Sequence, residues 1–194
     1  MYEYIKGFIT HKNPAYVVID IGGVGYRINI SIQTYEQLGN KEQAKLLIHL
    51  SIKEDSHTLY GFYSEEERNM FKNLVSVPGI GSNTAILILS SFKTSEIIQA
   101  IINANVSLLK SIKGVGPKTA QRMIIELQDT LQKKGETLIP ATGGRGQSVE
   151  EAISALHLLG FKKNEAEKVI FKIVRENPGP MNVEELIKLA LKSL

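Results

Sequence analysis

Two short glycine-rich segments hold the residues whose types and spacing could do chemistry. Residues 79–81 and 114–116 are both Gly-x-Gly, and they lie in two copies of one pattern, 74–85 and 109–120, in which Leu, Ser, Gly, Gly, Thr and Ala match in register. Such a turn lets the backbone approach a ligand closely, because glycine has no Cβ. A helix that begins after it offers free N–H groups and the positive end of its dipole. Each copy therefore predicts a site for a phosphate-sized anion.

Side chains after the second Gly-x-Gly strengthen this prediction. Pro117 suits a first helical position, Lys118 can point at the same phosphate, and Thr119 adds a hydroxyl donor. Two hairpins related by approximate two-fold symmetry would contact both backbones of a duplex without reading its sequence. The alternative is that the glycines only end helices in a bundle, whereas a nucleotide-binding P-loop is not indicated because its spacing is absent. The candidate ligands are Gly79, Gly81, Gly114, Gly116, Lys118 and Thr119.

The segment before Ser64 is typical of β-structure. Short runs rich in β-branched and aromatic residues are separated by turn signals such as the Gly-Gly-Val-Gly of residues 22–25. These runs lie at about 4–9, 16–21, 26–30, 46–52 and 58–63. Five short strands predict a small Greek-key barrel, with an OB-fold favoured and an SH3-like barrel as the alternative.

From Ser64 onward the pattern is helical. Ser64 and Glu67 have the spacing of a capping box. Helices are expected at about 65–76, 82–91, 95–103, 105–112 and 117–134, and amphipathic helices at about 148–158, 164–176 and 182–193. We therefore expect an α+β multidomain chain with an OB-fold barrel (1–63), an all-α tandem hairpin domain (64–132), a flexible linker (133–147) and a three-helix bundle (148–194).

Composition narrows the function classes. The chain has 194 residues, a formal net charge of +3 and no cysteine, which excludes disulfides, thiolate metal sites and a cysteine nucleophile. The histidines have no metal-ligating spacing, so no intrinsic catalytic site, metal or cofactor is expected. No long apolar run or N-terminal signal is present, which predicts a cytoplasmic protein without membrane contact. Positive charge is concentrated in residues 105–134, where six basic groups face only Glu126 and Asp129.

The duplicated segment resembles the helix–hairpin–helix motif of DNA-binding proteins, and the order of modules is similar to that of the RuvA family of bacterial Holliday-junction branch migration. Further matching stretches are 22–26 (Gly-Gly-Val-Gly-Tyr), 53–55 (Lys-Glu-Asp) before 59–62 (Leu-Tyr-Gly-Phe), and 158–161 (Leu-Leu-Gly-Phe). The resemblance covers essentially the whole chain. It implies a non-catalytic subunit that binds four-way junctions, holds them open and square, and acts in recombination and DNA repair.

The resemblance also implies partners and residue roles. The partners are further copies of the chain in a homotetramer or a pair of tetramers, the RuvB hexameric ATPase gripped by the UBA-like C-terminal bundle, and, as a further candidate, the RuvC resolvase. Glu54 and Asp55 would form an acidic pin that repels phosphates at the junction centre. Arg122 would be a further phosphate contact. The motor-binding surface would include Leu159, Gly160 and Phe161.

The first hairpin departs from what the family implies. Ser82 and Asn83 stand where the second copy has Pro117 and Lys118, although relatives often have a basic residue in both places. Its phosphate contact is therefore expected to rest on backbone N–H groups and the side chains around Asn83, namely Ser82 and Thr84, and to depend less on salt. We predict that Lys118→Ala lowers the salt slope of junction binding by about 1 and that Asn83→Ala hardly changes it.

Two alternative functions remain open at this point. One is a helix–hairpin–helix DNA-processing enzyme of the nuclease or glycosylase kind, and the other is a general structure-specific DNA-binding protein.

Overall fold

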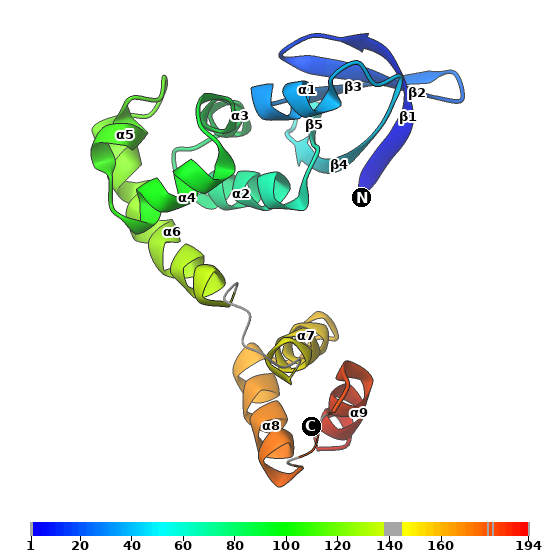
Figure 1. Ribbon diagram of the computed structural model, residues 1–194, viewed down its shortest axis with the longest axis vertical. Helices are drawn as coiled ribbons and strands as arrows, with labels where there is room; N and C mark the ends of the chain where they lie inside the picture. Colours follow the sequence, from blue (N-terminus) through cyan, green and yellow to red (C-terminus); the bar gives the residue numbers. More distant parts are fainter. Residues whose placement is uncertain (1, 138–144, 178, 180, 194) are drawn as a thin grey trace. The chain divides into compact units, whose positions relative to one another are not determined.

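The computed structural model describes residues 2–137, 145–177, 179 and 181–193 of the chain. It divides into two compact units, Met1–Lys134 and Gly135–Leu194, and each is described by itself (Figure 1). Residues 138–144, in the middle of the expected linker, lie outside the described residues. Helix α6 continues to Thr137 and helix α7 begins at Arg145, so the first and last residues of the expected linker, 133–137 and 145–147, are helical.

The first unit begins with a closed five-stranded barrel in the order β1-β2-β3-β5-β4. Its strands are β1 (Tyr4–Lys12), β2 (Tyr16–Ile21), β3 (Val24–Ile30), β4 (Gln43–Ile52) and β5 (His57–Phe62). All pairs are antiparallel except β3 with β5, and helix α1 (Ile32–Leu38) lies between β3 and β4 in the chain. The predicted barrel is confirmed, and its order and connections are those of the OB-fold.

Alternating apolar side chains close the barrel. Val17 and Ile19 of β2 and Ile28 and Ile30 of β3 are buried, whereas the residues between them are more exposed. This period of two is what a strand with one face on the core requires. Leu38 of α1 lies in the same cluster of buried residues, so the helix packs against the barrel core.

Five helices complete the first unit, and they share a core with the barrel. They are α2 (Glu65–Ser76), α3 (Ser82–Ser91), α4 (Thr94–Ile102), α5 (Val106–Lys110) and α6 (Pro117–Thr137). Phe71 of α2 lies at the centre of this core, with ring centroids 5.2 Å from Tyr60 and 4.9 Å from Phe62, both on β5. This aromatic packing holds the helices at a fixed position on the barrel.

Polar contacts reinforce the same joint. Ser64 Oγ accepts a hydrogen bond from the Glu67 backbone N–H at 3.2 Å, as the capping-box spacing predicts. The Glu67 carboxylate turns instead to the barrel and accepts hydrogen bonds from Ser31 and from Thr34, the latter at 2.7 Å. Glu67 is only 2% exposed, and its burial raises the pKa of the carboxyl despite these donors.

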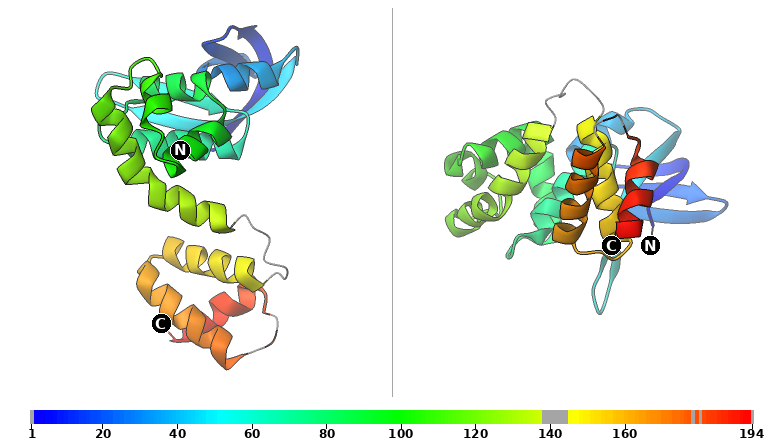
Figure 2. Two further views of the ribbon diagram at one scale, coloured as in Figure 1. Left: turned by 60° about the vertical axis from the view of Figure 1, so that its left-hand side comes forward. Right: turned by 90° about the horizontal axis from the view of Figure 1, so that it is seen from below.

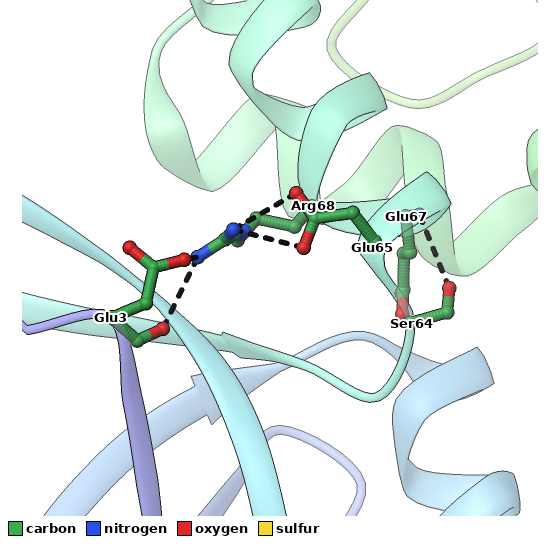
Figure 3. A network of polar contacts seen from close by, with 5 residues as sticks. All are labelled: Glu3, Ser64, Glu65, Glu67 and Arg68. Carbon is green, nitrogen blue, oxygen red and sulfur yellow. Dashed lines mark hydrogen bonds and ion pairs between the residues drawn. The ribbon is translucent and has the colours of Figure 1, made fainter. Parts of the chain in front are cut away.

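An arginine links the N-terminal residues to α2. Arg68 lies between Glu3 and Glu65, with Nη1 2.6 Å from a Glu3 carboxylate oxygen and Nη2 2.9 Å from Glu65 Oε1 (Figure 3). Because the Arg68 side chain is 7% exposed, this contact is better shielded from salt than a surface ion pair.

The second unit is a small helical domain. Helices α7 (Arg145–Leu158), α8 (Lys163–Glu176) and α9 (Val183–Ser193) all contact one another (Figure 2). Buried side chains from all three, including Leu156, Ile170 and Leu186, form one core. The expected three-helix region is confirmed.

The described part of the chain was also searched for membrane spans. No single helix there is long and apolar enough to cross a membrane; one pair, Ser82–Ser91 with Thr94–Ile102, bent by 100°, meets the test together by length and composition only.

Candidate nucleic-acid interface

The two Gly-x-Gly segments form the same backbone turn twice. In hairpin 1 (residues 77–84) the Ile80 N–H donates to the Val77 carbonyl at 3.0 Å, and in hairpin 2 (residues 112–119) Val115 donates to Ile112 at the same distance. The carbonyls of Gly81 and Gly116 each accept the first helical hydrogen bond four residues on, at 2.9 Å in both hairpins. The repeat in the sequence is therefore a repeat in structure.

The glycines of each hairpin are needed for two different reasons. Gly79 and Gly114 have φ of +95° and +89°, a backbone conformation that other residues rarely adopt. Gly81 and Gly116 have no positive φ, and a Cβ at either position would meet no atom within 4 Å other than those of its immediate neighbours in the chain. Neither the backbone nor packing within the described chain calls for glycine there. A bare position at the start of a helix leaves room for a ligand from outside the chain.

Residues of both hairpins line one surface depression. It is bordered by Pro78, Gly79, Lys118, Thr119, Gln121, Arg122, Ile125 and Glu126. Arg122 Nη1 donates to the Pro78 carbonyl at 3.3 Å, directly before the first glycine of hairpin 1. The predicted ligands Gly79, Lys118 and Thr119 thus lie around one surface, and Arg122 joins the two hairpins there.

Positive charge on this side of the unit is not neutralised by the chain. Lys110, Lys113, Lys118 and Arg122 are all exposed. Within the described ranges, none of the four takes part in an ion pair. Cations that have no carboxylate partner within the described residues are available to phosphates and would release counterions when they bind.

Hairpin 1 makes its side-chain contacts with the barrel. Tyr60 Oη donates to Asn83 Oδ1 at 2.9 Å, and Ser82 Oγ lies 3.5 Å from Ser51 Oγ. Burial raises the pKa of Tyr60, so its hydroxyl keeps its proton and acts as the donor at neutral pH. Thr84 is half-buried in the same helical turn. The side chains of hairpin 1 therefore bring no charge to the surface.

The predicted pin residues lie at the tip of the β4–β5 hairpin. Glu54 and Asp55 are both exposed, between Lys53 and Ser56, whose backbones pair across the turn with the Lys53 N–H 2.8 Å from the Ser56 carbonyl. Figure 2 shows this hairpin, in cyan, extending beyond the barrel. The carboxylates thus stand away from the packed body of the unit.

Comparison with known proteins decides the family. Family models described as RuvA N terminal domain, SAM-like helix-hairpin-helix tandem, and RuvA C-terminal domain match residues 1–61, 71–129 and 147–194. Two relatives named Holliday junction branch migration complex subunit RuvA, from Flavobacterium psychrophilum and Christiangramia forsetii, are 46% and 43% identical to this chain over the full length of both proteins. The chain belongs to the RuvA family.

The third RuvA family match contains the predicted motor-binding residues. Gly160 has φ of +101° and ends α7, while Phe161 is partly buried against the core of the C-terminal unit. Leu159 is 61% exposed, and two more large apolar side chains that were not among the predicted motor-binding residues, Leu158 (87%) and Phe171 (60%), are also exposed. The motif residues therefore divide into one core side chain and one surface side chain.

Sequence reasoning about this RuvA chain missed several residues of the interface. Pro78, Gln121, Ile125 and Glu126 border the depression, and Tyr60 holds Asn83. Helical spacing could have found the α6 residues, because positions 118, 122 and 125 share one face. Tyr60 had no such signal, since it lies 23 positions from its partner in another kind of element.

Proposed function

We propose that this chain is the DNA-binding subunit of a Holliday junction branch migration complex, that hairpins 1 and 2 hold the phosphate backbones of a four-way junction, and that the C-terminal unit recruits the RuvB ATPase. The observation that carries the proposal is the open space at Gly81 and Gly116, repeated in two hairpins that adjoin one depression. Backbone N–H groups at such positions bind phosphate without reading bases.

The charges divide the roles of the surface. Lys118 and Arg122 supply exposed positive charge near the hairpins, whereas Glu54 and Asp55 place negative charge at the tip of a barrel hairpin. Carboxylates on a DNA-facing surface weaken binding to the phosphate backbone, so they need a compensating role. Separating strands at the centre of the junction is that role.

Self-association into a homotetramer, or two tetramers enclosing the DNA, is part of the proposal. The barrel exposes several large apolar or aromatic side chains, among them Tyr4 (53%) and Phe8 (57%) on β1 and Val24 (55%) on β3. Exposed apolar surface of this kind is typical of protein contacts. Native mass measurement in the presence of junction DNA should give the mass of the DNA plus four or eight times the 21.5 kDa chain mass.

The partners and the division of the chain follow from the same reasoning. We assign junction contacts to residues 1–63 and 64–132, the linker to 133–147 and motor binding to 148–194. The exposed Leu158, Leu159 and Phe171 offer an apolar contact for RuvB. The RuvC resolvase is proposed as a further partner of the assembled complex, which acts in the cytoplasm.

The accessory role also has support. The matched relatives are named subunits of a branch migration complex, and RuvA is its non-catalytic subunit. Family membership therefore favours the adaptor over a DNA-processing enzyme.

The decisive experiment mixes the purified chain with a labelled four-way junction, a matched duplex, Mg²⁺ and ATP. We expect tighter binding to the junction than to the duplex, no cleavage and no base release, with branch migration only after RuvB is added. Strand cleavage or base release by the chain alone would contradict the proposal, as would equal affinity for both DNAs.

Truncation after Lys134 separates the two units. Residues up to Lys134 form one compact unit, so the shortened protein should keep junction affinity and lose RuvB-driven branch migration. Loss of DNA binding would show that the assignment of functions to the units is wrong.

A further inference from the structure

The β4–β5 hairpin touches hairpin 1 through Ser51 and Tyr60 and carries the pin at its tip. Ser51 of β4 lies three residues before Glu54, and Tyr60 of β5 lies five residues after Asp55. The two strands pair without interruption from Ile52 opposite His57 to residue 49 opposite Tyr60. Because the two strands are paired up to the turn, the position of the paired residues sets the position of the tip. Whatever holds Tyr60 therefore also places the pin.

The Tyr60 ring is fixed by packing. It is 5% exposed and lies against Phe71 with a centroid distance of 5.2 Å. His49, opposite Tyr60 on β4, also packs on the Phe71 ring, with a centroid distance of 5.0 Å. Burial, together with the positive charges of Lys72 and Arg68, lowers the pKa of the His49 imidazole. The ring of Tyr60 is thus packed among neutral aromatic groups, and its hydroxyl faces the start of α3, where Ser82 and Asn83 lie.

That hydroxyl reaches the first turn of α3. Asn83 follows Ser82 at the start of the helix, inside hairpin 1, and its Oδ1 accepts from Tyr60 at 2.9 Å. The equivalent position of hairpin 2 is Lys118, which is exposed and makes no hydrogen bond within the described residues. At this matching position, hairpin 1 has a hydrogen bond to the barrel, whereas hairpin 2 has a positive charge.

We infer that the Tyr60–Asn83 hydrogen bond is a positioning contact that fixes hairpin 1 relative to the acidic pin, so that the chain selects four-way junctions over plain duplexes. The inference rests on the proposed function. A duplex arm needs to meet only the hairpins, because it has no centre for the pin to enter. A junction must satisfy the hairpins and the pin together. A fixed distance between them therefore matters for the junction alone.

Tyr60→Phe is the direct test, since it removes one oxygen and keeps the packed ring. We expect junction binding to weaken by about two- to tenfold, the range for a neutral hydrogen bond. Duplex binding should stay within about twofold of the wild type, because the sequence-independent contacts to phosphates remain in the variant. The salt slope should not change, because no charge is lost.

Tyr35→Phe is the matched control. Tyr35 lies on α1 of the same barrel, where its ring is 4.9 Å from the Lys12 ammonium, and its hydroxyl has no hydrogen bond within the described residues. The same chemical change there should leave the affinities for junction and duplex as they are in the wild type.

Asn83 variants separate position from charge. Asn83→Ala should reduce the preference for the junction as Tyr60→Phe does, and the double variant should be no worse than either, because both single changes remove the same contact. Asn83→Lys adds a charge and loses the acceptor. It should bind duplex more tightly with a steeper salt slope while its preference for the junction falls.

The outcomes distinguish this inference from the proposed function. Equal losses for junction and duplex in Tyr60→Phe would make Tyr60 merely structural and would overturn the inference, as would an unchanged preference. If the wild type itself binds both DNAs equally, the proposed function fails and the inference falls with it. Should Tyr60→Phe unfold, the exposed Asn83→Ala variant gives the same reading.

Discussion

Lys118→Ala measures how much of junction binding comes from charge at hairpin 2. Lys118 is the second residue of α6, it is exposed, and the described part of the chain records no ion pair for it. Each such cation bound to a phosphate of B-form DNA contributes about 0.9 to the salt slope. Removal should therefore lower the slope by about 0.9 for each copy on the junction, or by about 3.6 for a tetramer.

The assay is anisotropy of a labelled junction titrated with protein at several salt concentrations between about 50 and about 200 mM. Between these two salt concentrations, a slope lower by about 0.9 means that the variant loses about 3.5-fold less affinity than the wild type for each copy that contacts DNA. The size of the change therefore also counts the copies that contact DNA, which native mass measurement checks independently.

Two variants serve as controls. Asn83→Ala should leave the slope unchanged, because Asn83 is neutral and its oxygen is held by Tyr60. Lys168→Ala removes an exposed charge from α8 of the other unit and should also leave it unchanged. If Lys118→Ala keeps the wild-type slope, or if Lys168→Ala lowers it equally, the assignment of Lys118 to a phosphate is refuted.

Three further results are expected. Gly114→Ala should lower the free energy of unfolding by about 1–3 kcal/mol because of its positive φ, whereas Gly116→Ala should lower it by less than about 1 kcal/mol. Both variants should weaken junction binding to the same extent. Urea unfolding and anisotropy measure the two effects, and equal losses of stability would contradict the prediction. Phe71→Ala should cost about 3–5 kcal/mol in urea, and a small loss would mean that the aromatic joint can repack. The raised pKa of Glu67 means that the folded state binds its proton more tightly than the unfolded chain, so stability should fall as pH rises above the ordinary value of 4.5. Glu67→Gln should flatten this dependence, and parallel stability profiles for variant and wild type would refute it.

Much of the fold could be predicted because its signals are local. Pro117 does begin α6, and Ser64 does cap α2. The in-register repeat predicted two equal turns, since the φ values and the Cβ space at the four glycines depend on a few neighbouring residues. Runs rich in β-branched and aromatic residues between turn signals likewise sufficed to predict the five strands.

What could not be predicted are contacts between residues far apart in the sequence. Glu67 has the right spacing for a capping box, but Ser31, 36 positions away, offers its carboxylate a buried hydroxyl. Arg122 was predicted as a further phosphate contact, and its hydrogen bond to the Pro78 carbonyl, 44 positions away, was not foreseen. Such partners are set by how elements pack, and no local spacing encodes them.

We infer that the two hairpins have different parts in recognising the shape of a DNA. Charge draws any DNA to the surface, because every phosphate is alike, so Lys118 adds affinity without selecting a junction. Selection of a branched DNA requires fixed distances between contacts, which neutral hydrogen bonds and packing supply. Tyr60 provides this for hairpin 1, and the bond from Arg122 to Pro78 extends it to hairpin 2. A chain with a net charge of only +3 can therefore discriminate well, since added charge would strengthen duplex and junction binding alike.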